Sequence, residues 1–143
     1  MTLLEIAAHR HALSRPIVHE AFTELVATAF LLIGVVGSGI MAEKLCGGNV
    51  GLALVANAIA TGGALVALIL AFGPQSGAHM NPVVTLAAAS TNGLRWHAVP
   101  AYIAAQIVGA IVGVWLAHIM FDLPVWQLSQ HARTGLPQWL PRS

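Results

Sequence analysis

The stretch SGAHMNPV, residues 76–83, carries the side chains best placed for chemistry, and that chemistry is non-covalent. Asn81 is a favoured helix N-cap residue, and Pro82 suits the first helical position because its missing N–H is not needed there. A helix that begins here presents unpaired N–H groups and the positive end of its dipole, and the Asn81 amide adds further donors. Ahead of it, an extended backbone would offer carbonyl acceptors from Gly77, Ala78 and His79. The pattern predicts hydrogen bonding to a small neutral solute and repulsion of cations.

Enzymatic chemistry is not indicated by the remaining polar residues. The five acidic residues are scattered along the chain, and no nucleophile stands at a telling distance from a base, so we expect no enzyme. The best metal-ligand pair, His9 and His11, is weak, and we expect no metal and no cofactor. A net charge of +1 indicates no nucleic-acid partner, and the single cysteine, Cys46, excludes an intrachain disulfide.

The composition indicates that this chain is dissolved in a lipid bilayer. Apolar residues make up 57% of the sequence, charged residues only 8%, and the mean hydropathy is +0.79. A soluble domain usually carries about 25% charged residues, so these few charges could not cover a surface exposed to water. We therefore expect a multi-pass protein of the cell membrane.

Three runs without charged residues indicate where the chain crosses the bilayer. They span residues 25–42, 45–94 and 96–121. About 20 apolar residues cross the hydrocarbon core, which predicts transmembrane helices over residues 21–42, 49–72 and 98–121. Within the last of them, Gly109 and Gly113 form a GxxxG pattern, which favours close helix packing in lipid.

The middle run of 50 residues is too long for one crossing and must fold back. We predict a re-entrant segment over residues 73–91, with turn residues at Gly73-Pro74 and a helix of about ten residues after Pro82. Such a helix is about 15 Å long, half of a hydrocarbon core of about 30 Å, so it could enter the membrane without crossing it. Irregular backbone at membrane depth is tolerated only where it is packed in protein or lines a wet cavity, which favours a pore.

These residues resemble those of a known family. SGAHMNPV is similar to the first signature loop of the major intrinsic proteins, the aquaporins and glycerol facilitators. Residues 24–39 resemble the family's first span, and residues 101–113 its third span, with Gln106 in a structural role. The resemblance covers about residues 20–121 and implies a channel for water or small neutral solutes, of glycerol or metalloid type. The stretch GSGIMA, residues 37–42, is similar to a bacterial branch associated with arsenic resistance.

The resemblance implies roles for individual positions. Asn81 and Pro82 match the central constriction, Gly77, Ala78 and His79 match the stretch that lends carbonyls to the pore wall, and Thr61 matches a position of the outer selectivity filter. An aromatic residue is frequent at this last position, so threonine implies a wider or more polar opening. Val83 replaces the usual alanine after the proline. Glu24 matches a glutamate that holds the re-entrant loop through hydrogen bonds, although as the last charge before an uncharged run it could also lie at the headgroup boundary.

The resemblance extends to one half of the family's inverted repeat. The expected fold is an all-α membrane protein with three transmembrane helices and one re-entrant half-helix. We expect a polar lead-in over residues 1–20, the aquaporin-like half over 21–121 and an extramembrane tail over 122–143, where a second repeat would begin. A half-helix facing lipid alone would expose polar groups at high cost, so we expect a homo-oligomer or a complementary chain that supplies the second half. The alternative is a truncated, non-conducting remnant or interaction subunit.

Overall fold

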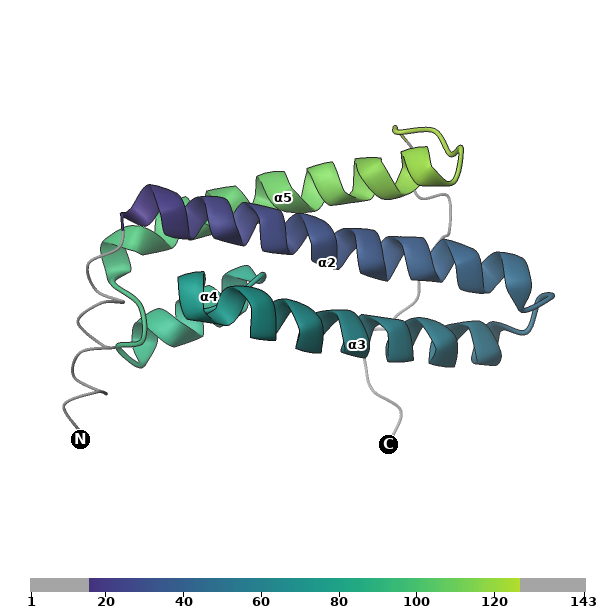
Figure 1. The fold of residues 1–143 in the computed structure, drawn as a ribbon, viewed down its shortest axis with the longest axis horizontal. Helices are drawn as coiled ribbons and strands as arrows, with labels where there is room; N and C mark the ends of the chain where they lie inside the picture. The colour runs from purple at the N-terminus through teal and green to yellow at the C-terminus, as the bar shows by residue number, and fades with distance from the viewer. Residues whose placement is uncertain (1–15, 127–143) are drawn as a thin grey trace, which may run out of the picture.

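The computed structural model describes residues 16–126, and this part of the chain is helical, with no strand (Figure 1). Its elements are three long helices, one short helix and a single 3-10 turn: α2 (Ile17–Leu45), α3 (Val50–Ser76), α4 (Pro82–Ser90), η1 (Trp96–Ala98) and α5 (Val99–Met120). The expected all-α fold with three long helices and one half-helix is confirmed.

The lengths of the helices separate those that could cross a membrane from the one that could not. Three helical stretches within residues 16–126 are long and apolar enough to span a bilayer: Ile17–Leu45, Val50–Ser76 and Trp96–Met120. By contrast, α4 has nine residues, which corresponds to about 14 Å at a rise of about 1.5 Å per residue. It is therefore about half as long as the hydrocarbon core is thick.

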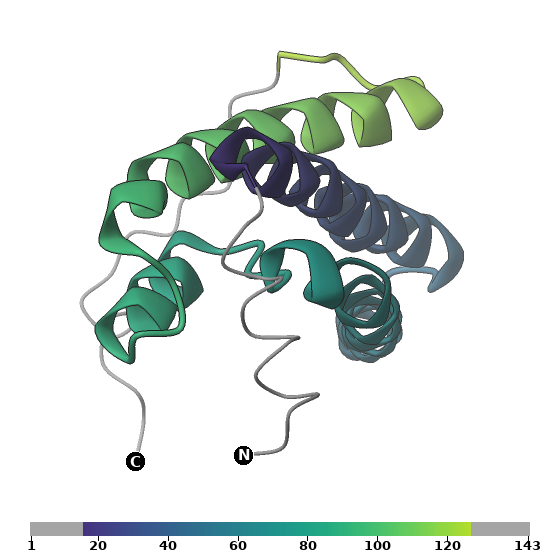
Figure 2. The ribbon, with the colours of Figure 1, turned by 60° about the vertical axis from the view of Figure 1, so that its left-hand side comes forward.

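The path of the chain explains how so short a helix is accommodated. Helices α2 and α5 run in one direction and α3 runs in the other, so α3 ends and α5 begins at the same end of the bundle (Figure 1). The segment between them, which holds α4, therefore enters and leaves by that end. Both α3 and α4 lie on one side of the pair formed by α2 and α5 (Figure 2).

Close packing of α5 on α2 builds the frame that carries the site. A Cβ atom added at Gly109 would overlap the carbonyl oxygen of Leu25, and one added at Gly113 would overlap that of Ala29. Both glycines are buried, so the predicted GxxxG pattern lets the two backbones touch. Helix α2 also packs against α3, whereas α4 packs against α5.

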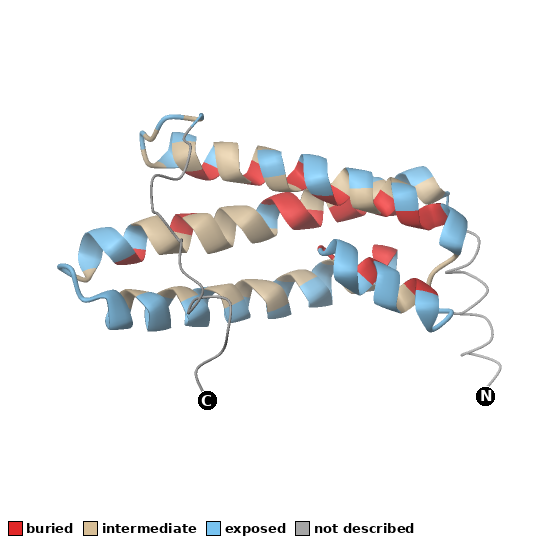
Figure 3. Ribbon diagram, turned by 180° about the vertical axis from the view of Figure 1, so that it is seen from behind, coloured by how far each residue is buried: buried red, intermediate tan, exposed pale blue. Residues whose placement is uncertain are grey.

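Burial is concentrated at the end of the bundle that holds α4. Figure 3 shows buried residues on α2, α4 and α5 near this end, and Ser76 is the single buried residue of α3. Much of the remaining surface is apolar: on α3, for example, Ile59 is 71% exposed and Leu70 is 75% exposed. Such a surface would be costly in water and suits contact with lipid.

Two boundaries differ from the sequence-based prediction. Helix α2 begins at Ile17, inside the stretch predicted as a polar lead-in, and α3 continues through Gly73-Pro74, which was predicted as a turn. Proline removes one N–H bond without ending the helix at once, and α3 ends instead at Ser76, followed by Gly77, whose φ of +91° is left-handed. His9, His11 and most of the predicted tail over 122–143 lie outside the described residues.

Candidate pore site

The loop between α3 and α4 has an unusual backbone. Gly77 donates its N–H to the carbonyl of Gly73 at 2.9 Å and closes the helix. Ala78 and Met80 follow with φ angles of +48° and +49°, so the backbone ahead of α4 is not extended throughout, contrary to what we expected from the sequence. Left-handed conformations cost about 1–3 kcal/mol at residues other than glycine, and they persist where the surroundings over-determine them. The loop must therefore be held by contacts from other elements.

Glu24 supplies these contacts from the middle of α2. Its side chain is fully buried, and each of its oxygens accepts two hydrogen bonds. Oε1 accepts from the Ser76 hydroxyl at 2.6 Å and from the His79 backbone N–H at 2.9 Å. Oε2 accepts from the Met80 backbone N–H at 2.7 Å and from the Gln106 amide at 2.8 Å. All four partners donate, as an ionised carboxylate requires, so one charge fixes α3, the loop and α5 together.

Thr85 forms a second buried centre on the first turns of α4. Its hydroxyl donates to the Asn81 carbonyl at 3.1 Å and accepts from the Gln106 amide at 2.9 Å. His79 Nδ1 lies 3.2 Å from the same hydroxyl oxygen. Because the single hydroxyl hydrogen is used on Asn81, Nδ1 carries the hydrogen in this bond, and Nε2 is left as an acceptor. Gln106 therefore joins the two centres and orients α4 on α5.

Asn81 begins α4 in the arrangement that its residue type favours. Its Oδ1 accepts the N–H of Val83 at 2.8 Å, and Pro82 occupies the first helical turn. The side-chain NH₂ group of Asn81 is consequently left facing outward, since the residue is exposed. Pro82 and Val83 are exposed beside it, and Val83 is 72% exposed. The amino end of α4 thus presents donors on an uncovered face of the molecule.

Comparison with known proteins identifies this arrangement. The sequence matches the pattern of the Major intrinsic protein family over residues 11–137. The chain belongs to the major intrinsic protein family. Members of this family are channels and not enzymes.

Curated relatives within the family come from bacteria, plants and fungi. The chain is 51% identical to Aquaglyceroporin AqpS of Rhizobium meliloti over 82% of its own length and 50% of that protein. It is 39% identical to the probable aquaporin NIP7-1 of Arabidopsis thaliana, over 70% of this chain and 37% of the relative. An aquaporin of Laccaria bicolor is 34% identical over 92% of this chain and 48% of the relative. The chain therefore spans about half the length, or less, of these major intrinsic proteins.

The residues that the family resemblance singles out lie together at the loop between α3 and α4, except Thr61. Glu24, Gly77, Ala78 and His79 lie together at the loop, followed directly by Asn81, Pro82 and Val83. Thr61 lies farther back on α3, half-buried, one helical turn before Leu65. Leu65 packs against the buried cluster of Ala27, Ala78 and Met80, so Thr61 is on a face of α3 that leads toward the loop.

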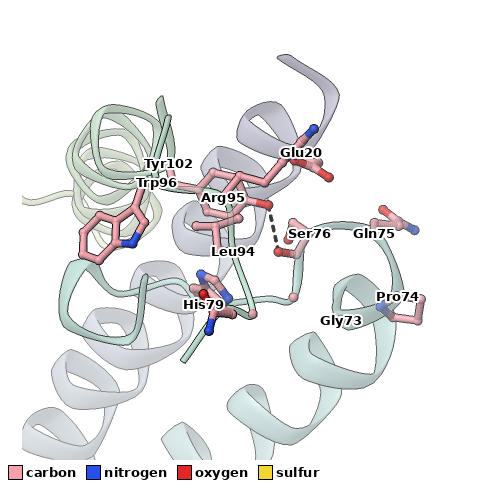
Figure 4. A pocket seen from close by; sticks show the side chains of 13 residues that line it. Glu20, Gly73, Pro74, Gln75, Ser76, His79, Leu94, Arg95, Trp96 and Tyr102 are labelled. Atoms are coloured by element: carbon pink, nitrogen blue, oxygen red, sulfur yellow. Dashed lines mark hydrogen bonds and ion pairs between the residues drawn. The ribbon is translucent and has the colours of Figure 1, made fainter. Parts of the chain in front are cut away.

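A pocket of about 430 Å³ opens beside the loop, at the end of the bundle where α4 lies (Figure 4). His79, Ser76 and Tyr102 contribute to its lining. The Tyr102 hydroxyl donates to the Ser76 carbonyl at 2.9 Å and ties the end of α3 to α5. At the rim, the Arg95 guanidinium lies 3.4 Å from the buried carboxylate of Glu20, which links the segment after α4 to the start of α2. A solute approaching the loop from this end would meet polar groups that are already oriented.

Sequence reasoning missed several residues that support the site. They are Ser76, Thr85 and Tyr102, which bond to Glu24, Asn81 and the end of α3. Helical spacing could have indicated Thr85 and Tyr102. Thr85 lies four residues after Asn81, and Tyr102 lies four residues before Gln106 on one face of α5. Across residues 16–126, no group of three or more His, Cys, Asp or Glu residues could hold a metal ion.

Proposed function

We propose that this chain forms one wall of a channel in the cell membrane for passive passage of water or small neutral solutes. The observation that carries the proposal is the amino end of α4, which is anchored by Glu24 and Thr85 yet leaves the Asn81 amide facing outward. A passing solute would accept hydrogen bonds from this amide and donate them to carbonyls of Gly77, Ala78 and His79. The positive end of the α4 dipole would repel cations.

The size of the solute depends on Thr61, which we propose as part of the outer selectivity filter. A threonine leaves more room than an aromatic side chain and adds a hydroxyl group. A neutral solute larger than water, such as glycerol or a metalloid hydroxide, suits this opening. The relative from Rhizobium meliloti is named an aquaglyceroporin, which supports glycerol as a solute for this chain as well.

The opposite wall of the channel would come from another chain, either a second copy or a complementary partner. Support for a partner comes from the exposed face around Val83, because polar groups at the start of α4 would contact lipid if nothing covered them. The same exposure favours the alternative of a non-conducting subunit that packs against other channels.

Osmotic shrinkage of vesicles tests the proposal. We expect vesicles that contain the chain to pass water and glycerol faster than empty vesicles, measured by light scattering after an osmotic step. Asn81→Asp keeps an oxygen to cap Val83 but removes the outward NH₂ group, so we expect it to slow both solutes several-fold while the helix content stays unchanged.

The matched control is Asp122→Asn, which exchanges the same two residue types at an exposed position just after α5, where a left-handed φ suits both and which does not line the pocket beside the loop. It should leave both rates unchanged. Rates equal to those of empty vesicles for the unmodified chain contradict conduction by this chain and favour the non-conducting alternative. Equal effects of the two substitutions would show that no permeation path passes Asn81.

A further inference from the structure

A second pocket lies at the other end of the bundle, away from the loop. Its volume is about 760 Å³, and it lies between the end of α2 and the beginning of α3. Its lining includes the amide side chains of Asn49 and Asn57, the carboxylate of Glu43 and the small residue Gly39. A pocket of this size with a few polar groups has the dimensions of a small-molecule site.

The amide of Asn57 is held in one orientation by α2. The Ser38 hydroxyl lies 2.7 Å from Asn57 Oδ1 and 3.3 Å from the carbonyl of Val35. A separation of 2.7 Å is typical of an O–H···O bond and short for an N–H···O bond, so the hydroxyl donates to the amide oxygen. This bond fixes which end of the amide faces Ser38 and which end faces away.

The other end of this amide is available to a ligand. The Asn57 NH₂ group has no hydrogen-bond partner within residues 16–126, and the residue is half-buried in the pocket wall. A Cβ atom at Gly39 would lie 3.6 Å from Asn57 Nδ2, in ordinary van der Waals contact, and glycine leaves that side of the amide uncovered. Two oriented N–H donors are thus presented to the pocket.

We propose that Asn57 is a binding residue for a small neutral solute, donating hydrogen bonds to its oxygen atoms. This inference rests on the proposed channel function, because Asn57 lies four residues before Thr61 on the same face of α3. A solute held at Asn57 is one helical turn from the proposed filter. The Glu43 carboxylate in the same pocket accepts hydrogen bonds from hydroxyl groups and repels anions, which favours polyols over anionic ligands.

Side-chain amide resonances provide the test. The full chain, labelled with ¹⁵N and placed in lipid nanodiscs, is titrated with glycerol and followed by ¹H–¹⁵N correlation spectra. We expect the Asn57 NH₂ peaks, assigned by their loss in Asn57→Leu, to shift and saturate. The indole N–H peak of Trp126, an exposed residue that lines neither pocket, serves as the control for bulk effects of glycerol and should follow only a linear drift.

Two variants separate a binding role from a packing role. Ser38→Ala keeps Asn57 but releases its amide, and we expect about threefold to tenfold weaker apparent affinity, the effect of losing one orienting hydrogen bond. Gly39→Ala keeps both groups but narrows the approach to Nδ2, and it should also weaken the glycerol response.

The inference is overturned if the Asn57 peaks move no more than the Trp126 indole peak, or if Ser38→Ala leaves the titration unchanged. Vesicle permeability distinguishes this failure from failure of the proposed function. Permeable vesicles with an unresponsive Asn57 contradict only the binding site. A saturating response at Asn57 in a chain that leaves vesicles as tight as empty ones supports the site and contradicts conduction.

Discussion

At the scale of single residues, one carboxylate decides the shape of the loop. Glu24 accepts hydrogen bonds from two backbone N–H groups of the loop, a hydroxyl group and an amide. A charge buried in a membrane protein is costly unless its acceptor capacity is filled, and here it is filled by four donors, two of which are backbone N–H groups of the loop. The left-handed φ angles of Ala78 and Met80 are stable because of these bonds.

Glu24→Gln tests this account of the loop. The substituted amide nitrogen would face two donors, and each unsatisfied buried donor costs about 1–3 kcal/mol, so we expect a loss of roughly 2–6 kcal/mol in the free energy of unfolding. Thermal unfolding in detergent, followed by circular dichroism, measures the loss. Glu43→Gln changes an exposed carboxylate of the same helix and should leave the midpoint within error. A similar midpoint for both variants would contradict the assigned role of Glu24.

At the scale of helices, close contact between α2 and α5 places Gln106 within reach of both Glu24 and Thr85. Gly109 and Gly113 follow Gln106 by three and seven residues and bring the α5 backbone against carbonyls of α2. A methyl group at either glycine would overlap backbone atoms, which cannot move aside as a flexible side chain could.

Gly109→Ala should therefore separate the two helices and destabilise the protein by about 1–3 kcal/mol or more. Gly62→Ala is the matched control, because nothing lies within 4 Å of a Cβ atom built on this glycine of α3. In a helix interior that substitution gains about 0.5–1 kcal/mol from backbone entropy. Unfolding midpoints in detergent should move in opposite directions, and a tolerated Gly109→Ala would rule out the tight α2–α5 contact.

The helices could be predicted from the sequence because each long apolar run has one stable form in lipid, a helix that satisfies its own backbone. The anchoring contacts could not be predicted in full, because they join distant segments. Gln106 and Glu24 are 82 positions apart, and Tyr102 and Ser76 are 26 apart. Likewise, the left-handed residues of the loop depend on Glu24 rather than on their own preferences. That Asn81 and Thr61 line a permeation path stays a prediction.

At the scale of the whole molecule, the face that holds the amino end of α4 is exposed within the described residues. Glu24, Thr85 and Gln106 are buried behind α4, whereas Val83 on its amino end is 72% exposed. If a second copy covers this face, it would approach with its own α4, and the two copies would have to be inserted in opposite orientations. Two Val83 side chains would then lie close together.

Oxidative crosslinking tests such pairing. In a Cys46→Ser background, which removes the natural thiol, we expect Val83→Cys to form disulfide-linked dimers in native membranes. Val55→Cys, at a position of α3 that is 55% exposed, is the control and should remain monomeric. Crosslinking of both variants to the same extent would indicate random collision, and the absence of a Val83→Cys dimer would favour a complementary partner chain.

The opposed directions of α3 and its two neighbours have a consequence for how such a molecule could grow. If the three long helices all cross the bilayer, the number of crossings is odd, and a segment that leaves α5 sets out from the face opposite to the one where α2 begins. A tandem duplicate of these helices, fused after Met120, would be threaded upside down by parity alone. A two-fold arrangement around the middle of the bilayer would then follow from the odd number of crossings.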